Sequence, residues 1–151
     1  MRKVNYNKED LLGHHAVAAV IKDRAGGVLM QKHLKYGFWT IPVGKVKKGQ
    51  NVEEGLKEEI KEECNLSVKK SRQIKFRRYN YIRDGKRVIV LAHLFEVLSY
   101  TGTMRNREPQ KHGEQRFLPL ARIKRLPYIS DMTLLYLSAL GYKRKARLTR
   151  K

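Results

Sequence analysis

Apolar residues run along the first part of the chain in two short stretches separated by turn residues. Residues 15–22 (HAVAAVIK) predict a buried strand, and residues 28–33 predict a second strand. Between them, DRAGG at residues 23–27 is typical of a turn. We therefore expect a β-hairpin, followed by a loop in which Gly37 and Pro42 interrupt any regular element.

The next segment has helical periodicity. Its apolar residues recur at every fourth position: Val52, Leu56, Ile60 and Cys64. This spacing predicts a helix over 52–64 with one apolar face. Asn51 is a suitable N-cap, and Asn65 is suited to end the helix because asparagine tolerates the left-handed conformation.

The remaining chain predicts three more strands and a second helix. In order, these are strands at 67–82, 87–98 and 115–120 and a helix at about 130–140. Asp84-Gly85 joins the first two strands and is a strong hairpin signal, while Ser130 is a suitable helix cap. The order β-β-α-β-β-β-α predicts an α/β protein of the α+β type, with helices packed on a mixed sheet.

Composition restricts the class of protein. The 151 residues, of which 41% are hydrophobic, are enough for one domain with its own core. We expect this domain over 1–142 and a basic tail over 143–151. No apolar run is long enough for a membrane span or a signal peptide, and the lone Cys64 excludes an internal disulfide. These features favour a cytoplasmic protein without membrane contact.

The charge is large and uneven. Thirty-four Lys and Arg against 14 Asp and Glu give a net charge of +20, which favours polyanionic partners or serves as a solubilising surface. Six cations lie in 143–151 and nine in 69–87, where Asp84 is the only acid. In contrast, six of the 14 acids lie between Glu53 and Glu63, inside the predicted helix.

Three of these acids share one side of that helix. At 100° per residue, Glu59, Glu62 and Glu63 fall within an arc of roughly 100°. Like charges at this spacing repel, and a divalent cation converts the repulsion into coordination. The alternative is a solvated acidic face, which needs no ligand.

The surrounding segment, GKVKKGQNVEEGLKEEIKEECNL, resembles the Nudix box, the loop-helix-loop signature of the Nudix hydrolases. Six of the nine specified positions of the signature match: Gly44, Glu59, Ile60, Glu62, Glu63 and Leu66. The segments at 14–33, 38–45 and 106–120 are also similar to the family, in the family's order. The resemblance implies the Nudix fold, in which a mixed sheet is sandwiched between helices and a loop-helix-loop forms the metal site.

Three positions depart from the signature. Asn65 replaces a glycine, which the helix end tolerates. Gln50 replaces a glutamate and Glu58 replaces an arginine, and in the family these two residues pair. We hypothesise that the Gln50 amide donates to the Glu58 carboxylate, which keeps the contact with its polarity reversed.

The resemblance also implies a metal-dependent activity. A water attacks phosphorus in a nucleoside triphosphate or another nucleoside-diphosphate-linked compound, as in MutT-like nucleotide pyrophosphohydrolases. The metal, Mg²⁺ or alternatively Mn²⁺, is expected on three carboxylates: Glu59, Glu62 and Glu63.

Four other residues receive roles from the same resemblance. The general base is either Glu59 or Glu114, and the alternative for Glu114 is an exposed acid at a strand edge. Lys32 and Lys45 are candidates for phosphate contacts. Glu108 is a candidate for contacting the nucleobase or ordering its loop.

Two alternative functions stay open. The first is hydrolysis of the 5′ end of RNA, with RNA or another polyanion held by the basic surface and the tail at 143–151. The second is a non-catalytic nucleic-acid-binding module with a vestigial box, which the changes at Gln50 and Glu58 favour. The intact acidic triplet favours the enzyme.

Overall fold

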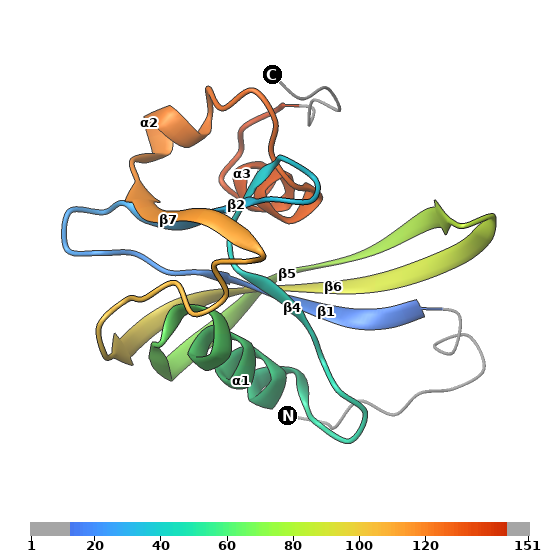
Figure 1. Ribbon diagram of the computed structural model, residues 1–151, viewed down its shortest axis with the longest axis horizontal. Coiled ribbons are helices and arrows are strands. Elements are labelled where there is room, and N and C mark those ends of the chain that lie inside the picture. The colour runs from blue at the N-terminus through green and yellow to red at the C-terminus, as the bar shows by residue number, and fades with distance from the viewer. Residues whose placement is uncertain (1–12, 145–151) are drawn as a thin grey trace.

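The computed structural model describes residues 13–144 (Figure 1). The larger part of the basic tail predicted at 143–151 lies outside these residues. Within 13–144, no helix has both the length and the apolar character needed to cross a membrane. The cytoplasmic location stays a prediction.

A four-stranded mixed sheet forms the centre of the fold. Its strand order is β4-β1-β6-β5. The strands are β1 (Gly13–Val20), β4 (Val43–Lys45), β5 (Ser67–Arg83) and β6 (Lys86–Thr101). Strands β1 and β6 are parallel and the other pairs are antiparallel, so the sheet is mixed as predicted.

A second, three-stranded antiparallel sheet has the order β3-β2-β7. Its strands are β2 (Val28–His33), β3 (Trp39–Thr40) and β7 (His112–Leu118). The predicted turn is present, since the Asp23 amide donates to the Gly27 carbonyl. The predicted hairpin is wrong beyond the Lys22–Val28 bridge. Strands β4 and β6 occupy the two edges of β1, and β2 instead pairs with strands of the other sheet.

Two helices cover opposite faces of the four-stranded sheet (Figure 1). These are α1 (Val52–Cys64) and α3 (Asp131–Ala139), while the short α2 (Leu120–Ile123) was not predicted. Asn51 caps α1, and Asn65 ends it in the left-handed conformation with φ 63°. The predicted sandwich of a mixed sheet between helices is therefore confirmed, and each helix encloses one hydrophobic core.

The antiparallel pair β5–β6 forms a long arm that extends from the body of the molecule (Figure 1). Asp84 and Gly85 make its turn, both with positive φ, which is the geometry that the Asp-Gly signal requires. We call the segment from Arg77 to Arg87 the β-arm. It contains most of the second basic segment and borders the pocket described below.

Candidate active site

Glycine at position 44 allows the helix to approach β4. The Glu59 side chain of α1 lies directly over Gly44, and a Cβ atom built there would lie 2.2 Å from the Glu59 Cδ atom. Any other residue would have to displace this carboxylate. The match of Gly44 to the signature therefore has a steric cause: glycine makes room for an acidic side chain against the sheet.

Glu63, one helical turn further, is completely buried. Two donors contact its carboxylate: the Gln31 amide at 3.2 Å and the Lys111 ammonium at 3.3 Å. Burial raises the pKa of Glu63, although Lys111 and Gln31 act in the opposite direction. For Lys111, burial acts to lower the pKa, but the hydrogen bond and charge of Glu63 together with the charges of Glu108 and Glu59 outweigh it, so the pKa is raised.

The same environment also raises the pKa of Glu59. Burial, followed by the charges of Glu63 and Glu62, raises its pKa to about 7. Glu62 lies outside, with 53% of its side chain exposed, 4.0 Å from the Lys47 ammonium. The structure thus brings Glu59 and Glu63 into one half-buried acidic site and leaves Glu62 at its rim.

The donor set of this site suits a hard divalent cation, because carboxylate oxygens are its preferred ligands and because positive charge relieves the repulsion that raises the Glu59 pKa. The present rotamers are not those of a closed metal site. Among residues 13–144, no three His, Cys, Asp or Glu side chains converge as a metal would require. Lys111 supplies the positive charge beside Glu63.

Two glutamines support Glu63 from β2 and β7. The Gln115 amide donates to the Gln31 Oε1 atom at 2.6 Å and to the Glu63 carbonyl at 3.3 Å. Neither the two glutamines nor Lys111 was predicted as a site residue from the sequence. Gln31 carried a signal, because it is a polar residue at an inward position of an apolar strand. Lys111 carried none in a chain with so many lysines.

The residues that depart from the box form a brace beside the acidic site, which we call the Lys47–Gln50–Glu58 brace. The Gln50 amide donates to the Glu58 carboxylate at 2.6 Å, as hypothesised. The Lys47 ammonium also pairs with Glu58, which the sequence analysis did not predict. The hydrogen bond to Lys47 is the main cause of the lowered pKa of Glu58. The loop thus still contacts the helix through a pair of opposite charges, Lys47 and Glu58.

The structure does not bring Glu114 to the acidic site. In the register of β7 and β2, Glu114 lies opposite Lys32. The neighbouring residues Gln115 and Gln31 also lie opposite each other, and their side chains face Glu63. Because side chains alternate along a strand, Glu114 and Lys32 lie on the other face of the sheet. Glu114 is exposed and pairs with Arg116 at 2.8 Å.

Two other predicted residues have different surroundings. Lys45 is exposed on the face of β4 opposite to Gly44, so it lies away from Glu59. Glu108 lies in the loop before β7, where its negative charge contributes to the raised pKa values of Glu59 and Glu63. The structure therefore places Glu108 close to the acidic site.

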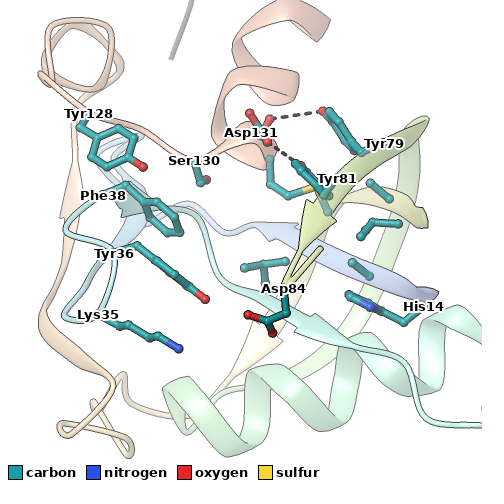
Figure 2. A pocket seen from close by; sticks show the side chains of 15 residues that line it. His14, Lys35, Tyr36, Phe38, Tyr79, Tyr81, Asp84, Tyr128, Ser130 and Asp131 are labelled. Carbon is teal, nitrogen blue, oxygen red and sulfur yellow. Dashed lines mark hydrogen bonds between the residues drawn. The ribbon is translucent and has the colours of Figure 1, made fainter. Parts of the chain in front are cut away.

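A pocket of about 560 Å³, which we call the aromatic pocket, opens on the α3 side of the four-stranded sheet. Figure 2 shows Tyr36 and Phe38 on one side of it and Tyr79 and Tyr81 of the β-arm on the other. At the N-terminus of α3, Asp131 accepts a hydrogen bond from the Tyr81 hydroxyl through its carboxylate. The pocket therefore combines aromatic faces with a few fixed polar groups, as small-molecule sites do.

The sandwich fold, the acidic loop-helix-loop and the adjacent pocket together define a class of protein, the Nudix hydrolases. The NUDIX domain family model matches residues 13–136. The chain therefore belongs to the NUDIX family, which hydrolyses nucleoside-diphosphate-linked compounds.

Solved structures agree with this fold. The MutT NUDIX hydrolase of Burkholderia pseudomallei is 21% identical and has a TM-score of 0.69, over 85% of this chain and 98% of that chain. The NUDIX domain of Shewanella oneidensis NrtR, complexed with ADP ribose, is 14% identical and has a TM-score of 0.67, over 91% of this chain and 92% of that chain.

A third similar structure is a C. elegans Ap4A hydrolase in a binary complex. It is 21% identical with a TM-score of 0.59, over 85% of this chain and 99% of that chain. No curated protein sequence matches this chain.

Proposed function

We propose that this NUDIX protein hydrolyses a pyrophosphate bond in a nucleotide, with the polyphosphate at the acidic site and the nucleoside in the aromatic pocket. One observation carries the proposal. A protein of net charge +20 buries Glu63 and half-buries Glu59 in one site, where burial raises the pKa values of both carboxylates and the charge of Glu63 raises that of Glu59 further. Carboxylates held in this way are typical of a functional site.

Glu59, Glu62 and Glu63 are the residues that would hold Mg²⁺, with Mn²⁺ as the alternative. When bound, a divalent cation neutralises phosphate oxygens and lowers the pKa of water. Lys111 contributes from the chain itself, because its ammonium lies 3.3 Å from Glu63 and is able to contact a phosphate oxygen. In this proposal Lys111 exchanges a carboxylate partner for the substrate.

Glu59 is our candidate for the general base. Its carboxylate lies in the acidic site over Gly44, whereas Glu114 lies on the other face of its sheet. In the reaction, the water oxygen bonds to phosphorus while the bond from that phosphorus to the bridging oxygen breaks. The leaving phosphate takes the electron pair, and the water proton passes to Glu59.

A nearby pocket supports the nucleotide class of substrate. Tyr36 and Lys35 line both the aromatic pocket and a smaller one of about 350 Å³ that Lys111 also lines. Since Lys111 contacts Glu63, the two shared residues join the acidic site to the aromatic pocket. A substrate that spans both needs phosphates at one end and a flat ring at the other.

The non-catalytic alternative rested on the changes at Gln50 and Glu58. The brace retains the contact between loop and helix, since Gln50 donates to Glu58 and Lys47 adds the positive charge. These departures therefore do not by themselves favour a vestigial box, and the enzyme is the function that we propose.

The test is turnover of a nucleotide panel with Mg²⁺ or Mn²⁺, measured as release of phosphate or pyrophosphate. The panel contains nucleoside triphosphates, ADP-ribose and dinucleotide polyphosphates. We expect metal-dependent turnover by the wild type, its loss in Glu63→Gln, and its retention in the matched control Glu53→Gln, which alters the first turn of the same helix. The absence of metal-dependent turnover on every substrate would reject the proposal.

A further inference from the structure

Two glutamines of the three-stranded sheet form a chain of hydrogen bonds that ends on Glu63. The Gln115 amide of β7 donates to Gln31 Oε1 at 2.6 Å, and the Gln31 amide of β2 donates to Glu63 Oε1 at 3.2 Å. Gln31 and Glu63 are completely buried, so water does not compete for this contact. Gln115 therefore reaches the carboxylate through Gln31.

The direction of this chain is fixed by an atom that only accepts. The Gln115 amide nitrogen also donates to the main-chain carbonyl of Glu63 at 3.3 Å, and a carbonyl oxygen has no proton to give. Turning the Gln115 amide over would place two oxygens against each other. Because Gln115 presents its nitrogen to Gln31 Oε1, Gln31 presents its own nitrogen to the Glu63 carboxylate. The chain thus starts and ends on the same helix residue.

Two further neighbours fit this orientation of Gln31. The Gln31 nitrogen lies 3.5 Å from His112 Nε2, and burial is the main cause that lowers the pKa of His112 to about 4. The imidazole is therefore neutral near pH 7 and able to accept a hydrogen bond. On the other side, the Cys64 thiol donates to Gln31 Oε1 at 3.8 Å. Acceptors surround the nitrogen of Gln31 and donors surround its oxygen.

Packing alone does not require a glutamine at position 115. Within residues 13–144, Gln115 Oε1 is buried and forms no hydrogen bond, which is unfavourable in a folded protein. A methionine has a similar length and carries no such oxygen. The donor that Gln115 presents to Gln31 gives the glutamine a role that packing does not explain.

The two oxygens of Glu63 differ as a result. Oε1 is held inside the protein by Gln31, whereas Oε2 contacts the ammonium of Lys111, whose side chain is 41% exposed. A lysine on a flexible stem changes its position more easily than an amide held by several partners. Oε2 is therefore the oxygen that becomes open to a cation when Lys111 moves.

We propose that Gln115 is a positioning residue that acts through Gln31 and presents Glu63 Oε2 to the divalent cation. This inference rests on the proposed function, because it takes Glu63 as a metal ligand. Groups that orient a metal ligand typically change metal affinity by roughly 10- to 100-fold. Other residues of 13–144 line the aromatic pocket, so the two glutamines act on the metal and not on the nucleoside.

The experiment measures binding of Mn²⁺ alone by electron paramagnetic resonance, without nucleotide. The variants are Gln31→Met, Gln115→Met and the double variant, which keep the length of the side chains and remove the amides. Gln73→Met, the same change at an exposed position of β5, is the matched control. We expect the Kd for Mn²⁺ to rise roughly tenfold in each single variant. Because Gln115 acts through Gln31, the double variant should bind Mn²⁺ as Gln31→Met does.

Turnover distinguishes positioning from a general loss of structure. At limiting Mn²⁺, Gln115→Met should hydrolyse a nucleotide roughly tenfold more slowly than the wild type, and saturating Mn²⁺ should restore its kcat. The KM for the nucleotide should stay within about twofold. A loss of kcat that saturating Mn²⁺ does not restore would reject the positioning role.

Lys111→Met tests the assignment of Oε2 and leaves the buried amides in place, so it decides this part of the proposal even where a buried variant does not fold. Removing the ammonium should tighten Mn²⁺ binding by roughly threefold, the size expected for a partly exposed ion pair. Lys57→Met, at an exposed position of α1, is the control. Equal changes in the two variants, or weaker binding in Lys111→Met, would reject Oε2 as the metal-facing oxygen.

The remaining outcomes separate this inference from the proposed function. Additive effects of Gln31→Met and Gln115→Met on the Kd would reject the action of one through the other. An unchanged Kd in both variants, or a wild type that does not bind Mn²⁺, would reject the positioning role. The expected pattern of Mn²⁺ binding without turnover of any nucleotide would keep the positioning role and reject the proposed function.

Discussion

Glu58 and Glu59 are neighbours in the chain, yet their carboxylates belong to two regions of opposite character. In the Lys47–Gln50–Glu58 brace, the hydrogen bond from Lys47 lowers the pKa of Glu58. In the acidic site, burial raises the pKa of Glu59 to about 7. The helix turns by 100° between them, which directs one toward the solvent and the other over Gly44.

This difference separates stability from function. The brace joins opposite charges and holds the loop on the helix, whereas the acidic site gathers like charges and lowers the stability of the fold. Proteins retain such unfavourable groups where the chemistry requires them. We expect this difference to affect catalysis most, stability as a function of pH less, and coupling within the brace least.

The largest effect is expected on the rate. If Glu59 accepts the proton, Glu59→Gln should lower kcat by about 10²- to 10⁴-fold, because the amide cannot act as a base. Glu58→Gln, the adjacent control, should retain most of the activity. The measurement is steady-state turnover of the best nucleotide with saturating Mg²⁺.

Glu114→Gln tests the other candidate base in the same assay. Because Glu114 lies on the opposite face of its sheet from Glu63, we expect a change of less than about threefold. A large loss in Glu114→Gln together with a small loss in Glu59→Gln would reverse the assignment.

The next effect is on stability as a function of pH, without divalent metal. Glu59 has a pKa of about 7 in the folded state against an ordinary value of 4.5. As pH rises from about 4.5 to 7, the unfolded chain releases a proton that the folded chain retains, so the wild type loses stability over this interval. Glu59→Gln removes this loss.

We therefore expect Glu59→Gln to match the wild type near pH 4 and to exceed it above pH 7 by about 1 kcal/mol, since solvent partly screens a half-buried carboxylate. Urea unfolding at pH 4, 6 and 8 in a chelator measures the difference. A difference that stays constant across pH would show that the charge of Glu59 is not its cause.

The smallest effect is the coupling within the brace. Gln50→Ala and Glu58→Ala each remove one side of the 2.6 Å hydrogen bond, so their effects on the free energy of unfolding should not add. We expect a coupling of about 0.5 kcal/mol, measured by a double-mutant cycle. Additive effects would show that the contact does not stabilise the protein.

Local sequence patterns predicted much of this fold correctly. The helix over 52–64 has the predicted bounds and caps, because its apolar spacing and both asparagines act within a few residues. The Asp84-Gly85 turn was predicted for the same reason. The hairpin predicted around the turn at 23–27 is wrong except next to the turn. Strand β1 pairs instead with β6, which lies about 75 residues further along the chain and which local sequence patterns do not identify as its partner.

The candidate site was only partly predictable. The spacing of Glu59 and Glu63 identified the acidic face, but neither Gln31 nor Lys111 could be assigned to Glu63, since each comes from a different strand or loop. The position of Glu114 in the sequence made it a candidate for the general base. Which face of β7 it occupies depends on the pairing of β7 with β2.

The sequence by itself determined which residues share a helix face, where the helix begins and ends, and that an acidic cluster stands within a basic chain. These properties depend on backbone geometry and on neighbours a few residues apart. Only the tertiary structure decided that Glu58 is paired while Glu59 is half-buried. Burial and pairing depend on distant segments, and they set the charge state that the chemistry uses.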